Sequence, residues 1–147
     1  MYITKQKNMI TKKQFTTLND LFDYYNKVLF NMELGHCLVN MSRHRGAHGF
    51  FAPKRWNDEL NQEVHEISLN PDTMNRDDID WHSTLVHEMV HLWQELTNNR
   101  ARRGYHCRKF ADKMESIGLI PSSTGLPVGK RTGQNMTHYV QEGGKFQ

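Results

Sequence analysis

The chain has 147 residues, of which 37% are hydrophobic and 24% are charged, and its formal net charge is +3 at pH 7. This length suits one domain with a single core, and the composition excludes both a wholly disordered chain and a membrane protein. No stretch approaches the roughly 18 consecutive apolar residues of a membrane helix, and the lysine-rich start lacks the apolar segment of a secretory signal. We therefore expect a cytoplasmic protein. Two cysteines, Cys37 and Cys107, are too few for a disulfide framework, and both are expected to remain reduced thiols.

The first predicted element is an amphipathic helix preceded by a basic arm. Residues 1–14 carry four lysines and no acidic residue, and their lack of periodicity favours a flexible arm. Between residues 18 and 32 apolar side chains recur at helical spacing, and Thr16 or Thr17 can cap the start. Gly35 is expected to end the helix, because glycine readily adopts the left-handed conformation that follows many helices.

Residues 36–70 change to a strand pattern. One strand begins at residues 38–41, and a second begins at residues 50–52, where Pro53 is expected to break it. Residues 64–69 alternate apolar and polar with period two, as in a strand with one buried face. We predict a small sheet of three antiparallel strands.

Two further helices are expected after the strands. The second helix lies within residues 77–99 and starts near Asp80 or Ser83. The third helix runs from about residue 105 to 117, and Gly118 fits the position just after its end.

The sequence therefore predicts an α+β fold with one domain at residues 15–120. Residues 121–147 are rich in glycine, serine and threonine, and are expected to form a loop-rich tail. Residues 136–140 are a candidate short strand within it.

The second helix contains His87-Glu88-Met89-Val90-His91, which matches the motif H-E-x-x-H. Histidines four residues apart lie one above the other on a helical face, so their imidazoles can converge on one metal ion. The glutamate beside the first histidine projects toward the open side of such an ion, where it can deprotonate a bound water.

The residues around the motif favour a metal site over a chance match. On a helical wheel the apolar residues form a broad arc, and one polar stripe carries the motif together with Thr84 and Glu95. A buried helix that lines a cleft has this pattern. The alternative is that both histidines belong to the polar face of an ordinary amphipathic helix.

A catalytic zinc site uses three protein ligands, so a third ligand is needed. Glu95 lies about 12 Å along the helix axis from His87, which is too far for both to bind one ion easily. The metzincin continuation of the motif is absent, because Gln94 and Thr97 occupy its glycine and histidine positions. The third ligand must come from another part of the chain.

His106 is the best candidate for the third ligand. In the expected third helix it shares a face with Phe110 and Met114, which should pack on the neighbouring helix. The alternative is a partly buried histidine that caps this helix. Asp112 and Glu115 are weaker carboxylate candidates, since both lie further round the helix.

With these residues the sequence resembles the SprT-like family of zinc metallopeptidases, which includes bacterial SprT and metazoan Spartan proteins. The resemblance rests on residues 85–91 and on His106-Cys107-Arg108-Lys109-Phe110 after a fourteen-residue gap. Residues 67–71 also resemble the strand that leads into the active-site helix of the family. The similarity covers roughly residues 17–120.

The resemblance implies a zincin-like fold in which Zn²⁺ is held by His87, His91 and His106, with Glu88 as the general base. It implies an endopeptidase that acts on proteins bound or crosslinked to DNA. The alternatives are a zinc protease independent of DNA and a non-catalytic, DNA-associated zinc module; a base beside the ligands argues against the latter. Many members carry a C-terminal zinc ribbon, which two cysteines cannot form. His138, Tyr139 or a loop residue could assist as oxyanion donor.

Basic residues flank His106 and form a candidate contact for single-stranded DNA: Arg100, Arg102, Arg103, Arg108 and Lys109. Such a patch can follow a phosphate backbone. Further basic residues could extend the patch, namely Arg43, Arg45, Lys130 and Arg131. Three aromatic residues could stack on single-stranded bases, namely Phe50, Phe51 and Trp56. The structural alternatives are a solvated connector for the arginines and packing of the strands for the aromatics.

Overall fold

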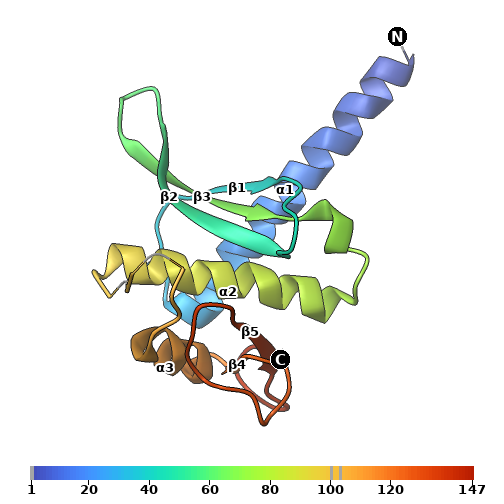
Figure 1. Ribbon diagram of the computed structural model, residues 1–147. Helices are drawn as coiled ribbons and strands as arrows, with labels where there is room; N and C mark the ends of the chain where they lie inside the picture. The colour runs from blue at the N-terminus through green and yellow to red at the C-terminus, as the bar shows by residue number, and fades with distance from the viewer. Residues whose placement is uncertain (1, 100, 103) are drawn as a thin grey trace.

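The computed structural model describes residues 2–99, 101, 102 and 104–147, with side chains from residue 16 onward. Within these residues the fold is α+β, with three α-helices and two small sheets (Figure 1). The elements are α1 (Tyr2–Phe30), β1 (Leu38–Met41), β2 (Gly49–Asn57), β3 (Glu63–Leu69), a 3-10 turn η1 (Pro71–Thr73), α2 (Asp78–Leu96), α3 (Arg108–Ser116), β4 (Leu119–Ser122) and β5 (Thr137–Val140).

The first sheet has the strand order β1-β3-β2, and the prediction of three antiparallel strands is wrong. β1 runs parallel to β3, with Val39 opposite Ile67, whereas β2 runs antiparallel to it, with Phe51 opposite Ile67. β3 takes the centre because residues 66–69 are all buried, and a central strand has neighbours on both sides. The connection at residues 42–48 spans two strand spacings, about 10 Å, which seven residues reach easily.

β2 continues past Pro53, where the sequence analysis expected a break. The strand is at the edge of its sheet, where a proline does not remove a ladder hydrogen bond. Its register shifts between Ala52 and Trp56, and Lys54 has φ of 52° within this irregular stretch. A bulge therefore accommodates the proline.

α1 confirms the amphipathic helix and extends it at the N-terminal end. The helix begins at Tyr2, so residues 2–14, expected as a flexible arm, have helical backbone. It ends at Phe30 rather than at Gly35, because Asn31 and Met32 already adopt left-handed backbone, with φ of 51° and 63°. The apolar face packs into the core through Leu18, Phe22, Leu29 and Phe30, all of which are buried.

α2 is the central element of the molecule. It lies between the three-stranded sheet and the layer formed by α3 and the β4–β5 pair (Figure 1). Leu85, Val86, Met89 and Val90 are completely buried, because both sides of the helix are covered. The broad apolar arc of the wheel is therefore confirmed, and residues 78–96 lie within the predicted range.

α3 starts later than predicted and leaves His106 outside the helix. The helix begins at Arg108, while His106 forms an isolated β-bridge with Gly133 through two backbone hydrogen bonds of 2.8 and 3.1 Å. The predicted end is confirmed, since Ile117 is the C-cap and Gly118 follows with φ of 92°.

The tail is partly ordered into a second sheet. β5 confirms the candidate strand, and it pairs antiparallel with β4, which the sequence analysis did not predict because Pro121 lies within it. Phe146 is buried in the hydrophobic core, so the C-terminal segment contributes to the packing of the fold. None of the described helices combines the length and the apolar character needed to cross a membrane.

Candidate metal centre

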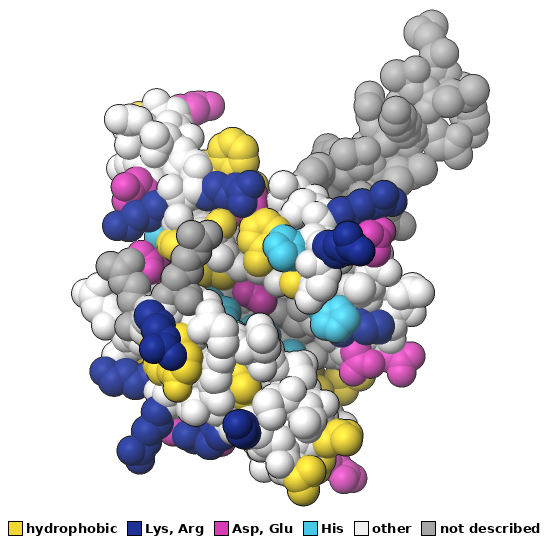
Figure 2. Space-filling view, viewed as in Figure 1, with side chains coloured by type: hydrophobic (Ala, Val, Ile, Leu, Met, Phe, Trp, Pro, Cys, Tyr) yellow, Lys and Arg dark blue, Asp and Glu magenta, His cyan; other side chains and the backbone are white. Residues whose placement is uncertain are grey.

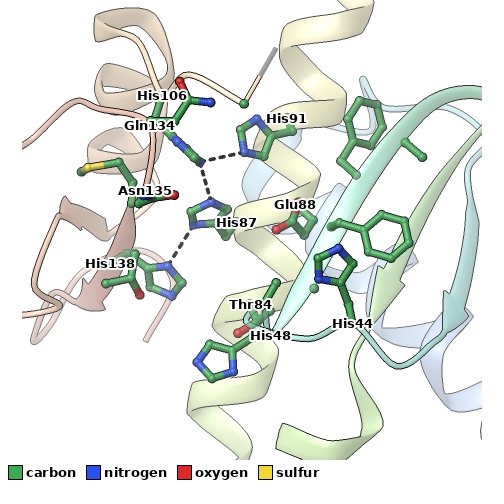
Figure 3. A pocket seen from close by; sticks show the side chains of 18 of the residues that line it. His44, His48, Thr84, His87, Glu88, His91, His106, Gln134, Asn135 and His138 are labelled. Carbon is green, nitrogen blue, oxygen red and sulfur yellow. Dashed lines mark hydrogen bonds between the residues drawn. The ribbon is translucent and has the colours of Figure 1, made fainter.

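Three histidines converge beside α2. His87 and His91 lie one turn apart on this helix, and His106 approaches from the segment before α3 (Figure 3). The Nε2 atom of His106 is 3.4 Å from Nε2 of His87 and 3.2 Å from Nε2 of His91. The same ring nitrogen of each histidine therefore faces one point, and this cluster could hold a metal ion.

The ring of Phe110 packs against all three imidazoles. Its ring is completely buried and lies 4.5 Å from the ring of His91, 5.1 Å from that of His87 and 4.9 Å from that of His106, between centroids. His106 and Phe110 were predicted to share one helical face. They do lie together, although His106 reaches this place from an extended segment.

Carbonyl oxygens orient two of the imidazoles. His91 Nδ1 lies 3.1 Å from Oε1 of Gln94, and His106 Nδ1 lies 3.2 Å from the backbone oxygen of Gly133. Since a carbonyl oxygen only accepts hydrogen bonds, each Nδ1 carries the proton and each Nε2 keeps its lone pair for a metal.

No role for Gln94 or Gly133 was predicted from the sequence. Gln94 could have been found, because it follows His91 by three residues and so lies on the same face of the helix. Gly133 acts through its backbone, which leaves no pattern in the sequence.

The third imidazole contacts a fourth histidine. His87 Nδ1 lies 3.1 Å from Nδ1 of His138, and Nε2 of His138 lies 2.7 Å from Oγ of Ser83. Both nitrogens of His138 are thus engaged behind His87, away from the point that the three Nε2 atoms face. Tyr139, the other residue considered as an oxyanion donor, does not line the cleft.

Burial keeps the candidate ligands uncharged. It lowers the pKa of His91 to about 3, and repulsion from His106 acts in the same direction. Burial likewise lowers the pKa of His87 well below its usual value and lowers that of His106, which hydrogen bonds to the backbone partly oppose. All three are neutral at pH 7, as metal binding requires.

Glu88 is buried beside the histidines, on the side of α2 that faces β2 (Figure 3). Its burial raises the pKa of the carboxyl group to about 8. A carboxyl group with a raised pKa next to a cluster of imidazoles is typical of an acid or base in a catalytic site.

These residues lie at the bottom of an open cleft of about 1610 Å³. Residues 42–44 and 46–53, from the loop before β2 and from β2 itself, form one wall, and residues 134–138 form part of the other. Figure 2 shows imidazole and acidic side chains inside the hollow and cationic side chains on either side of it. Within the described part of the chain, the arginines that line the cleft are Arg43, Arg55, Arg76 and Arg102.

The predicted basic patch is only partly assembled among the described residues. Arg102 lines the cleft with its guanidinium 4.5 Å from the ring of Tyr105. Arg108 and Lys109 are exposed at the start of α3 and do not line the cleft. Arg100 and Arg103 lie outside the described residues.

Arg131, named as an extension of this patch, forms ion pairs with Asp112 and Glu115. Neither carboxylate belongs to the three-histidine cluster that could hold a metal ion.

The aromatic residues named for base stacking differ in exposure. Phe51 packs against the hydrophobic core, as expected for a structural role. Trp56 is 49% exposed, although its Nε1 donates a hydrogen bond of 2.9 Å to the buried carboxylate of Glu66.

The family comparison covers most of the chain and includes the whole cluster. The SprT-like family model matches residues 18–132. The chain belongs to the SprT-like family. A search of curated proteins finds no match. Membership supports a metallopeptidase of SprT type, and His87, His91 and His106 are the residues of this SprT-like protein that could hold the metal.

Proposed function

We propose that this SprT-like protein is a zinc-dependent endopeptidase of zincin type. His87, His91 and His106 hold Zn²⁺, and Glu88 is the general base. The observation that carries the proposal is the convergence of three Nε2 atoms next to a buried carboxyl group at the bottom of an open cleft.

The spacing of the three nitrogens supports zinc. Ligands at 2.0–2.1 Å in tetrahedral geometry are separated from one another by about 3.3 Å. The Nε2 atoms of His87 and His91 are 3.4 and 3.2 Å from that of His106. Three neutral imidazoles also leave a fourth position for water or substrate, which distinguishes a catalytic zinc site from a structural one.

Glu88 carries the proton transfers in this mechanism. Bound zinc supplies a Lewis acid for the peptide carbonyl and a positive charge that favours the ionised form of Glu88. The Glu88 carboxylate then accepts a proton from the attacking water and delivers it to the nitrogen of the leaving amine. Burial holds the carboxylate beside the ligands, where it lines the cleft that the substrate would enter.

The shape of the cleft supports a polypeptide substrate. Its volume of about 1610 Å³ exceeds the roughly 300–1,000 Å³ of typical small-molecule pockets. β2 is an edge strand within the described sheet, and residues 49–53 line the cleft. An extended peptide can pair with such an edge through backbone hydrogen bonds.

A substitution of the base tests the proposal. Glu88→Gln should retain the zinc of the wild-type protein, measured by atomic absorption, and lose cleavage of an unstructured protein such as casein by at least about 100-fold. Glu59→Gln makes the same chemical change at an exposed turn and should leave both readouts unchanged. Cleavage by Glu88→Gln at the wild-type rate would exclude the mechanism. Zinc binding without cleavage by the wild-type protein would favour a non-catalytic zinc module.

We further propose that the substrates are proteins presented on single-stranded DNA. Among the described residues four arginines line the cleft, and one of them, Arg102, comes four residues before the candidate ligand His106, where a phosphate backbone could pass. Cleavage of a basic DNA-binding protein should therefore require single-stranded DNA and weaken as salt rises. Equal cleavage with and without DNA would leave a general zinc protease.

A further inference from the structure

We infer that His138 is a positioning residue for the metal ligand His87, and that it acts together with Ser83 by fixing which ring nitrogen of His87 carries the proton. The inference rests on the proposed metal site and adds to it a residue from the C-terminal part of the chain. β5 carries His138 to the side of His87 that faces away from His106 (Figure 3).

His87, His138, Ser83 and the backbone oxygen of Asp80 form a chain of hydrogen bonds. The direction of each bond follows from its last acceptor, the oxygen of Asp80. The backbone oxygen of Asp80 can only accept, so the Ser83 hydroxyl, 2.7 Å away, donates to it. The oxygen of Ser83 then accepts the hydrogen bond from His138, and the proton of this imidazole lies on Nε2. A neutral imidazole with its proton on Nε2 has a lone pair on Nδ1.

The position of the proton on His87 follows from that on His138. The Nδ1 atom of His138 accepts across 3.1 Å, so the Nδ1 atom of His87 carries the proton. Nε2 of His87 is then left with its lone pair, and it faces Nε2 of His106 at 3.4 Å. The opposite tautomer would place a proton where the metal must bind.

The role fits the arrangement around the other two ligands. Gln94 supplies an acceptor to Nδ1 of His91, and Gly133 supplies one to Nδ1 of His106. His138 fills the corresponding place behind His87, so each of the three ligands has an acceptor on its Nδ1. Because two of these acceptors lie beyond residue 120, the C-terminal segment is part of the metal site.

Zinc affinity measured by competition with a chelator tests this role without relying on activity. His138→Ala should bind zinc about 10–100-fold more weakly than the wild-type protein. His138→Asn should retain most of the affinity, because Oδ1 of asparagine offers an acceptor in a similar place to Nδ1. His44→Ala removes another imidazole that lines the cleft and should bind zinc as the wild-type protein does.

Ser83→Ala tests the outer half of the contact chain and covers the case in which His138→Ala does not fold. It should weaken zinc binding in the same direction, and the effect of the double variant should be smaller than the two single effects combined. Thermal unfolding of the zinc-free variants separates loss of positioning from general loss of structure.

The protonation state of His87 is a direct second readout. Nitrogen NMR of the zinc-free protein should show the proton of His87 on Nδ1 in the wild-type protein and a mixture of tautomers in His138→Ala. Wild-type affinity in His138→Ala, or a proton on Nε2 of His87 in the wild-type protein, would overturn the inference. A wild-type protein without zinc affinity, or undiminished affinity in His106→Ala, would instead contradict the proposed metal site.

Discussion

Arg131 binds Glu115 through two hydrogen bonds, from Nε to Oε1 at 2.6 Å and from Nη2 to Oε2 at 3.0 Å. Asp112 also pairs with Nη2, so both carboxylates on the outer face of α3 hold the same guanidinium. Gly133, whose carbonyl oxygen accepts from His106, comes two residues later in the chain. The ion pairs therefore hold the segment of Arg131 and Gly133 against α3, and this segment orients the candidate ligand His106.

Replacing Arg131 should destabilise the fold more than replacing its neighbour. Arg131→Ala is expected to lower the free energy of unfolding by about 0.5–1 kcal/mol. Partial exposure weakens the ion pairs, whereas the bidentate geometry with Glu115 strengthens them. Lys130→Ala removes the same charge one residue earlier and should change it by less than about 0.5 kcal/mol. Urea unfolding at low salt measures both. Equal effects would show that the ion pairs contribute nothing beyond net charge.

Gln94 should affect metal binding although it contacts no metal. Gln94→Leu removes the acceptor from His91 Nδ1 and should weaken zinc binding by about 10–100-fold. Gln94→Glu keeps an oxygen in the same place and should bind zinc more tightly than Gln94→Leu does. Competition with a chelator gives both affinities. Unchanged affinity in Gln94→Leu would mean that the ring of His91 is held by Phe110 alone.

The candidate metal site was predictable to the extent that it depends on helical geometry. His87, Glu88 and His91 follow from their spacing on one face of α2, and His106 follows from the need for a third ligand near this helix. Gly133 and His138 lie in a segment without strong periodicity, and one of them acts through its backbone. Nothing local marks such residues, because their role depends on a contact across the fold.

In the fold, too, the elements set by local sequence patterns were predictable, whereas those set by contacts between distant segments were not. The apolar periods of α1 and α2 predict both helices, because each buries one continuous face. The order β1-β3-β2 depends on which strand pairs with which. The alternation of apolar and polar residues along one strand does not identify the neighbouring strand. β4 was missed because Pro121 suggests a loop, whereas the strand pairs only with β5.

Gly118 is needed for close packing as well as for its backbone conformation. It has φ of 92°, and a Cβ atom there would lie 2.9 Å from the backbone nitrogen of Lys145 and 3.0 Å from that of Phe146. Gly118→Ala should therefore lower the free energy of unfolding by about 2–4 kcal/mol. Gly143→Ala has a similar φ of 70° with open space around the added atom, and should cost only about 1–2 kcal/mol. Similar losses in the two variants, measured by urea unfolding, would assign the whole effect to backbone strain.

Cys37 should react slowly with alkylating reagents. Burial raises the pKa of its thiol to about 12, and the carboxylate of Glu66 adds to this. At pH 8 the thiolate fraction is then on the order of 1 in 10,000, compared with about a quarter for a free cysteine, so alkylation should be roughly a thousand-fold slower. Mass spectrometry of the Cys37 peptide after iodoacetamide treatment measures the rate. The same protein in urea is the control, and a native rate within tenfold of that control would contradict the burial argument.

The same thiol should make stability fall at high pH. The folded-state pKa lies above the value of about 8.5 in an unfolded chain, so the unfolded state releases its proton first as the pH rises. The contribution of Cys37 to stability is complete below about pH 8.5 and decreases between that pH and about 12. Cys37→Ala removes this titration, so its free energy of unfolding should fall less steeply between pH 8 and 10. Parallel pH profiles for the two proteins would show that Cys37 ionises equally in the folded and unfolded states.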